Sequence, residues 1–173
     1  MTARRVAWWA LVIAMVVAIV VTAVLGVART RQPAQAADVP TTAAPLADSA
    51  QARKEATDFG SDAAVRILSY TPDTAQQKLT AAAELTTEPF KSEFQDLITK
   101  VVIPTAKEQA ITTRASVAAA GVEELDDQSA VLLVYVNQTV TKGADAPTDT
   151  QSSVRMTLER IDGRWLVSKF EPV

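Results

Sequence analysis

The chain contains no cysteine and no histidine among its 173 residues. Without cysteine it can form no disulfide, use no thiol nucleophile and bind no zinc through sulfur. Without histidine it lacks the side chain that most often serves as general base or metal ligand. Both absences count against catalysis, so we expect a non-enzymatic protein with no cofactor and no metal site.

Glycine and aromatic residues are also scarce, with five glycines, three tryptophans, two tyrosines and four phenylalanines. Few glycines leave little loop that could cradle a phosphate, and no Walker loop, GxGxxG, GxSxG or HExxH motif occurs. The 17 basic residues are outnumbered by 20 acidic ones, for a net charge of −3. Without a basic stripe, we do not expect a nucleic-acid partner.

One long apolar run is present, because residues 6–28 include no charged side chain. As a helix this run measures roughly 34 Å, enough to cross a hydrocarbon core of about 30 Å. Trp8 and Trp9 lie near one end, where indole rings favour the membrane interface. A cleaved signal peptide is the rival interpretation, but signal cores span only about 7–15 residues. We therefore predict a transmembrane helix over residues 6–28.

The basic residues that flank this run give its orientation only a slight bias. Arg4, Arg5 and the terminal amine precede the run, whereas Arg29 and Arg31 follow it. The positive-inside rule then favours a cytoplasmic stub of residues 1–5 and an extracytoplasmic, periplasmic domain on a single-pass cell-membrane protein. Residues 29–47 are rich in proline and alanine, which predicts a semi-rigid linker. A globular domain is expected over residues 48–173.

The first part of this domain has helical periodicity. Apolar residues at intervals of three or four predict helices over about 49–69, 72–84 and 88–109. Either Asp48 or Ser49 could cap the first helix, and Pro72 suits the first turn of the second. Pro104 is expected to end or kink the third.

Beyond Ala110 the period changes to two, which predicts strands over about 111–123, 129–141, 150–162 and 164–171. The second of these is apolar on both faces as far as Val136, which is typical of a central strand covered on both sides. Between the last two, Asp162-Gly163 suits a two-residue type I′ hairpin turn.

That turn sets a register in which Leu158 lies opposite Val167 and Arg160 opposite Trp165. Met156, Leu158, Trp165 and Val167 would then share one apolar face. Leu166 and Phe170 would lie on the reverse face, where they could form a partner surface with Val131 and Leu133 or be covered by the chain itself.

Three helices followed by four antiparallel strands predict an α+β domain. By analogy, the helices would pack on a curved sheet as in the cystatin-like or nuclear-transport-factor-2-like cone. Such cones can hold enzymes such as ketosteroid isomerases, whose pockets use buried carboxyl, tyrosine or histidine groups.

Few residues here could supply such chemistry. Asp62 and Arg66 are expected to form an exposed ion pair, and Tyr70 and Tyr135 to be core residues with wet hydroxyls. The acidic cluster within residues 123–127 lacks the spacing of a calcium loop. The adjacent amides of Asn137 and Gln138 interrupt an apolar strand, and structural hydrogen bonds are a more common role for them than ligand contact.

Several segments of the chain resemble the actinobacterial Mce-associated membrane proteins, whose domain is of the SnoaL-like cone type. They are the N-terminal span, LSY at residues 68–70, VYVNQ at residues 134–138, and the closing segment with Arg155, Asp162-Gly163, Trp165, Leu166 and Phe170. The resemblance implies a non-enzymatic accessory protein that stabilises Mce transporters, which import lipids such as fatty acids and sterols. It implies transporter subunits as partners and allows a lipid ligand.

Two alternatives remain open. An assembly subunit of a secretion-type envelope complex would have the same plan of one span and one cone. A lipid-binding or isomerase-like cone domain is the other.

Overall fold

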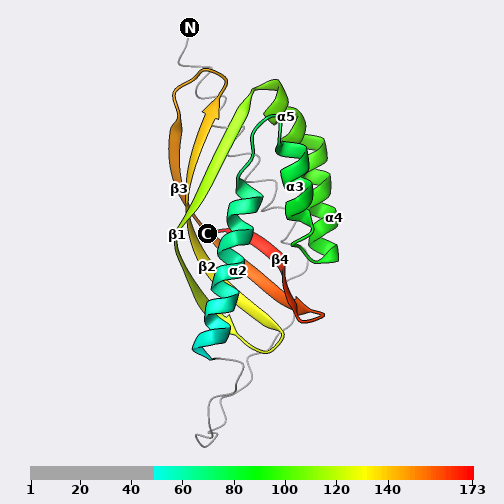
Figure 1. Ribbon diagram of the computed structural model, residues 1–173, viewed down its shortest axis with the longest axis vertical. Coiled ribbons are helices and arrows are strands. Elements are labelled where there is room, and N and C mark those ends of the chain that lie inside the picture. The colour runs from blue at the N-terminus through cyan, green and yellow to red at the C-terminus, as the bar shows by residue number, and fades with distance from the viewer. Residues whose placement is uncertain (1–48) are drawn as a thin grey trace, which may run out of the picture. The chain divides into compact units, whose positions relative to one another are not determined.

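The computed structural model describes residues 49–173 (Figure 1). Its helical segments are α2 (Ala50–Leu68), α3 (Ala75–Ala83), α4 (Glu88–Leu97), the π-helical η2 (Ile98–Val102) and α5 (Ile103–Glu108). The strands are β1 (Ile111–Leu125), β2 (Ser129–Lys142), β3 (Thr148–Ile161) and β4 (Arg164–Pro172). The predicted span and linker lie outside the described residues. Among residues 49–173, no helix has the length and apolar character needed to cross a membrane.

Polar side chains set the first helix boundaries. Ser49 caps α2, since its hydroxyl accepts a hydrogen bond from the Ala52 N–H at 3.1 Å. The predicted role of Pro72 is wrong, because α3 begins three residues later, at Ala75. Pro72 instead lies in a turn in which the hydroxyls of Thr71 and Thr74 contact each other at 2.7 Å.

The third predicted helix does not end at its proline, and a π-helical turn interrupts it just before that residue. α4, η2 and α5 follow one another directly, and the Ile103 N–H donates to the Ile98 carbonyl five residues earlier. Proline at position 104 has no N–H and would crowd the carbonyl of Lys100 in a regular helix. The wider π turn before Pro104 accommodates it, as π-bulges commonly do.

The four strands form one antiparallel sheet in the order β1-β2-β3-β4. All the described helical segments lie on one side of the sheet (Figure 1). The domain is therefore the predicted α+β arrangement of three helical stretches on a four-stranded antiparallel sheet.

β2 is a central strand, but the expectation that both its faces are covered is wrong for the described domain. Burial alternates along it. Leu132, Val134 and Val136 are almost fully buried on the helical side, whereas Leu133 is half-buried and Tyr135 is 47% exposed. Because apolar residues occupy both faces of β2, its sequence does not show the alternation of buried and exposed positions.

The hairpin between β3 and β4 has the predicted register. Asp162 and Gly163 have φ values of 51° and 75°, as a type I′ turn requires. Leu158 pairs with Val167, and Arg160 with Trp165. The sequence prediction is confirmed up to this point.

Phe170, however, does not lie on the reverse face. A bulge shifts the register so that Leu158 pairs with Val167 but Thr157 pairs with Lys169, leaving Ser168 as the extra residue. Phe170 then pairs with Met156, which is fully buried on the helical side. A one-residue shift reverses the direction of every following side chain, and it turns Phe170 towards the core.

Two clusters of buried side chains make up the core. The first lies between α2 and the sheet and includes Leu132, Met156, Leu158 and Val167. The second holds α3, η2 and α5 together around Leu79 and Ile98.

Candidate partner-binding face of the sheet

We call the side of the sheet that faces away from the helices the outer face. Because side chains alternate along a strand, the residues between the buried positions point to the outer face. It carries Val131, Leu133, Tyr135 and Asn137 of β2, Gln151, Ser153 and Arg155 of β3, Leu166 of β4, and Ala118 and Ala119 of β1.

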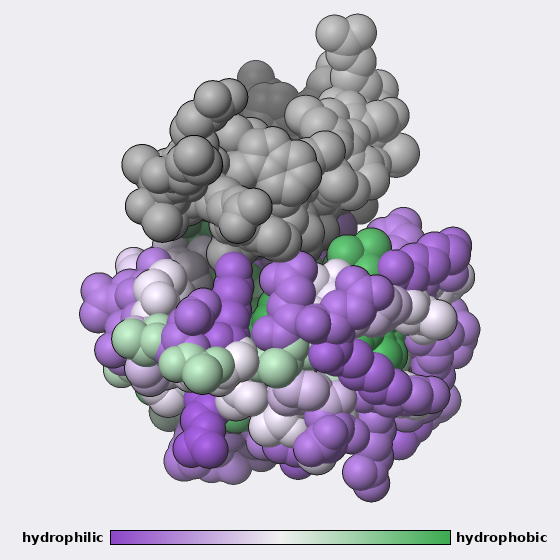
Figure 2. Space-filling model, turned by 90° about the horizontal axis from the view of Figure 1, so that it is seen from above, coloured by the Kyte–Doolittle hydropathy of each residue, from purple (hydrophilic) through white to green (hydrophobic). Residues whose placement is uncertain are grey.

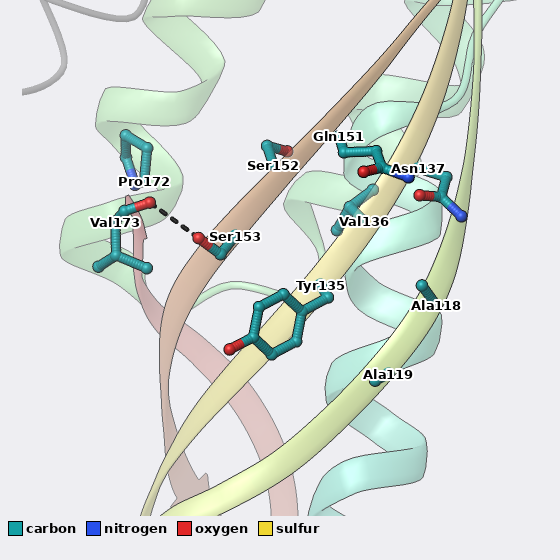
Figure 3. A pocket seen from close by; sticks show the side chains of 10 residues that line it. All are labelled: Ala118, Ala119, Tyr135, Val136, Asn137, Gln151, Ser152, Ser153, Pro172 and Val173. Atoms are coloured by element: carbon teal, nitrogen blue, oxygen red, sulfur yellow. Dashed lines mark hydrogen bonds between the residues drawn. The ribbon is translucent and has the colours of Figure 1, made fainter.

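A shallow hollow of about 660 Å³ lies on this face. Figure 3 shows the ring of Tyr135 lying across β2, with Ala118 and Ala119 beside it on β1. A register shift between Val117 and Ala119 inserts Ala118 as an extra residue of the edge strand, so both alanines are exposed. Two methyl groups cannot cover a phenol ring, and this explains the exposure of Tyr135. The lining residues are Ala118, Ala119, Tyr135, Val136, Asn137, Gln151, Ser152, Ser153, Pro172 and Val173.

The side chains that line the hollow are neutral but can form hydrogen bonds. They offer the hydroxyl of Tyr135 and the amides of Asn137 and Gln151. The Ser153 hydroxyl already donates to the Val173 carbonyl at 2.8 Å (Figure 3). Within residues 49–173 no side-chain partner holds the Asn137 amide. An aromatic surface with free amides around it is typical of a site that binds a neutral, partly apolar partner.

A charged bridge lies on the same face. Arg155 of β3 donates to the two carboxylate oxygens of Glu123 of β1, from Nε at 2.9 Å and from Nη2 at 3.4 Å. In the register, Arg155 lies opposite Leu133 and Leu133 opposite Gly121, so the bridge spans β2 where glycine leaves room. Hydrogen bonding by Arg155 lowers the pKa of Glu123, and the reciprocal contact raises the pKa of Arg155.

Several predicted site residues lie elsewhere. Tyr70 is on the helical side, where its backbone pairs with Thr113, and burial raises the pKa of its phenol. Trp165 is buried, with the Arg160 guanidinium carbon 4.4 Å from its ring centroid, as in a cation–π contact. Gln138 is half-buried on the helical side, and within residues 49–173 its amide has no hydrogen-bond partner. The structural hydrogen bonds expected for Asn137 and Gln138 are thus not found in the described domain.

The remaining predicted residues divide between turn, core and outer face. Asp162 and Gly163 form the hairpin turn, and Phe170 packs in the core. Only Tyr135, Asn137, Arg155 and Leu166 lie on the outer face. Sequence reasoning missed Ala118, Ala119 and Gln151, although the run of small residues at 118–121 could have indicated a thinly covered strand.

Charged groups outside this face have structural roles. Asp62 and Arg66 form the expected exposed pair on α2, at 2.7 Å. Asp126 organises the β1–β2 turn by accepting from Ser129 Oγ at 2.8 Å and from two backbone N–H groups, and these bonds lower its pKa. Within residues 49–173 no cluster of acidic side chains could hold a metal ion. The buried polar side chains of this part are threonines.

The end of the domain seen in Figure 2 is mainly hydrophilic across the coloured surface, with smaller apolar areas between polar side chains. The neutral hollow on the outer face therefore stands out as the better candidate for binding a partner.

The fold of this domain matches that of nuclear-transport-factor-2-like cones. It superposes on the periplasmic domain of DotI with a TM-score of 0.61 at 16% identity, over 75% of this chain and 99% of that one. An IcmL-like type IV secretion system protein from Legionella pneumophila gives a TM-score of 0.60 at 9% identity, over 70% and 91% of the two chains. VirB8 of Agrobacterium tumefaciens gives 0.54 at 15% identity, over 69% and 92%. At these identities the likeness shows the fold alone.

No model of a known protein family matches the chain. Over 126 residues, however, it is 45% identical to Outer membrane protein Rv1973 of Mycobacterium tuberculosis, covering 73% of this chain and 79% of that protein. The chain belongs to the family of that mycobacterial protein. It is also 40% identical over 123 residues to the uncharacterized protein Rv1362c of the same species, covering 70% of this chain and 56% of that protein.

Proposed function

We propose that the protein is a non-enzymatic, membrane-anchored accessory subunit of a cell-envelope complex, and that it binds a protein partner through the outer face. The observation that carries this proposal is the neutral hollow around Tyr135, which is 47% exposed at the centre of the sheet. An aromatic side chain that burial does not require and that lies among unpaired amides is well suited to an intermolecular contact.

The helical side of the sheet is a poorer candidate for binding a partner or a lipid. Leu132, Met156 and Leu158 are fully buried there. A methyl group added at Gly60 of α2 would lie 2.2 Å from Leu132 Cδ1, so helix and sheet are already in close contact. A lipid chain would have to displace this packing, and we therefore place the binding function on the outer face.

The complex that we favour is an Mce-type importer of lipids such as fatty acids or sterols. This choice depends on the resemblance of residues 134–138 and of the closing hairpin to Mce-associated membrane proteins. The relative Rv1973 carries the name outer membrane protein, which supports an envelope location. An extracytoplasmic domain tethered by residues 6–28 would lie where such an importer needs a supporting subunit.

An assembly subunit of a secretion-type complex is the second candidate. Its support is the fold likeness to DotI, to VirB8 and to a periplasmic fragment of TraM, which has a TM-score of 0.59 at 11% identity. Co-purification of the full chain from detergent-solubilised membranes distinguishes the two by whether lipid-import or secretion subunits accompany it.

Deletion of the gene provides the direct test. We expect lower levels of the importer subunits and reduced lipid uptake, both restored by the wild-type gene. Tyr135→Ala should accumulate normally but fail to restore uptake, because it removes the exposed ring and leaves the core intact. Val101→Ala, which changes an apolar residue 38% exposed on η2, is the matched control and should restore uptake fully. Unchanged subunit levels and uptake in the deletion strain would refute the Mce assignment.

A further inference from the structure

β3 is longer than β4, the strand that pairs with one of its two edges. On one side it pairs with β2 through residues 148–159, whereas on the other it pairs with β4 only from Val154 to Ile161. Figure 1 shows β3 continuing beyond the end of β4. Residues 148–152, which we call the open β3 edge, are thus hydrogen-bonded to a strand on one side only within the described domain.

The other sheet edges are covered or irregular. On β1, Thr113 pairs with Tyr70, the Ala115 N–H donates to the Ser69 hydroxyl oxygen at 2.9 Å, and the strand has two register shifts. β4 is covered at Val167, whose N–H donates to Leu85 at 2.8 Å and whose carbonyl accepts from Thr87 at 2.9 Å. Proteins protect edges in such ways because an open edge attracts another strand.

The backbone of the open β3 edge is correctly oriented for pairing. The carbonyl of Ser153 accepts from the Val173 N–H at 3.0 Å, so Ser153 directs its polar groups to the side of β4. By the alternation of an antiparallel strand, Gln151 and Asp149 direct their N–H and C=O groups to the same side. The edge has no proline, lysine or register shift that would hinder an added strand.

We propose that the open β3 edge accepts an extended segment of a partner protein as an additional strand, in line with the end of β4. This inference rests on the proposed function and names the contact that the partner makes. Only a polypeptide backbone offers the alternating donors and acceptors that match Asp149 and Gln151. The hollow lies beside this edge, since Gln151, Ser152 and Val173 line it.

The hollow also indicates which partner strand fits. The side chains of its lining carry no charge and include Tyr135 and two alanines, so a partner side chain directed to the outer face should be apolar or neutral. If two copies of this chain paired antiparallel about Thr150, the second copy would instead bring its own Asp149 and Gln151 towards the hollow. We therefore favour a strand from a different protein over a second copy.

The test uses the full chain in detergent micelles and tiled peptides of 12 residues as probes. One set covers the extracytoplasmic parts of Mce importer subunits, a second those of secretion inner-membrane subunits, and a third this chain itself. Binding is measured by titration, and amide hydrogen exchange is measured at Asp149 and Gln151. A peptide from either of the first two sets should bind and slow exchange at both amides.

Gln151→Pro removes the N–H that points away from β2. It should lower the affinity for that peptide at least about tenfold, the equivalent of one or two lost hydrogen bonds. Gln151→Thr also loses the side-chain amide but keeps the N–H in a residue that suits strands, so it should bind the peptide more tightly than Gln151→Pro does. If Gln151→Pro fails to fold, amide exchange at Asp149 and Gln151 of the wild type still tests whether a strand is added.

The inference is overturned if no peptide slows exchange at these amides, or if Gln151→Pro folds and binds like Gln151→Thr. It is also overturned if only the chain's own peptides bind and the protein is a dimer by light scattering. Binding by secretion peptides alone would support the strand addition while refuting the Mce assignment, so the two failures are distinguishable.

Discussion

The two faces of this sheet are built from adjacent residues of the same strands, yet they differ in how closely their side chains are packed. Leu132 is fully buried against α2, while Leu133, one position later, is half-buried on the outer face. Small residues show the same division. Gly60 allows α2 to approach Leu132, whereas nothing lies within 4 Å of a methyl group added at Gly121 on β1.

Small residues thus have opposite effects on the two faces: they allow close packing on one and leave a neighbouring side chain exposed on the other. On the helical side, small side chains bring a helix and a sheet into contact. On the outer face, the small side chains of Ala118 and Ala119 leave the ring of Tyr135 uncovered. We infer that the helical side maintains the fold and that the outer face is free to serve a partner.

The largest effect should come from truncating neighbouring leucines. Leu132→Ala should lower the free energy of unfolding by about 2–5 kcal/mol, because it leaves a cavity in a closely packed core. Leu133→Ala should cost less than about 1 kcal/mol, since solvent already reaches that side chain. Urea denaturation of the full chain in micelles measures both. Similar losses for the two variants would show that the outer face is packed as tightly as the helical side.

Glycine substitutions should have the next largest effect. Gly60→Ala would gain about 1 kcal/mol of helix propensity, but its methyl group would meet Leu132 Cδ1 at 2.2 Å. Leu132 is fully buried, so its side chain can shift only by displacing its neighbours, and we expect a net loss of about 1–3 kcal/mol from overpacking. Gly121→Ala is the matched control and should stay within about 0.5 kcal/mol of the wild type. A more stable Gly60→Ala protein would mean that the helix and the sheet can move apart without cost.

The helical side was the more predictable of the two, because burial imposes a period that a sequence displays. The Asp162-Gly163 turn fixed the pairing of Leu158 with Val167 from local chemistry alone. The bulge at Ser168 left no such signal, and it reversed the predicted direction of Phe170. Next to the bulge, Val167 forms backbone hydrogen bonds with Leu85 and Thr87, which are distant in the chain.

The outer face was harder to predict because its features depend on pairing between strands. The sequence drew attention to Tyr135 and Asn137, but not to Ala118, Gln151 or Val173, which complete the hollow. Three strands and the end of a fourth bring these residues together. Similarly, the open edge follows from the unequal lengths of β3 and β4, which only the pairing register shows.

The smallest effect should come from the charged bridge on the outer face. Arg155 lowers the pKa of Glu123 below its ordinary value of 4.5. A carboxylate whose pKa is lower in the folded state stabilises the fold above its unfolded pKa, and this contribution is lost as the pH falls through the folded value. Glu123→Gln should therefore be slightly less stable than the wild type at pH 7, and the difference should disappear at a pH below the lowered pKa. Thermal unfolding at a series of pH values measures this.

Glu159→Gln, on the same face of β3, is the control for removal of one surface charge, since no ion pair holds Glu159 within residues 49–173. It should show no comparable pH-dependent difference. Both groups of the bridge are largely exposed, with Arg155 and Glu123 side chains 48% and 36% accessible, so solvent screening keeps the effect small. High salt should reduce it further. A large, salt-independent loss in Glu123→Gln would mean that the bridge holds β1 against β3, and that the outer face, like the helical side, maintains the fold.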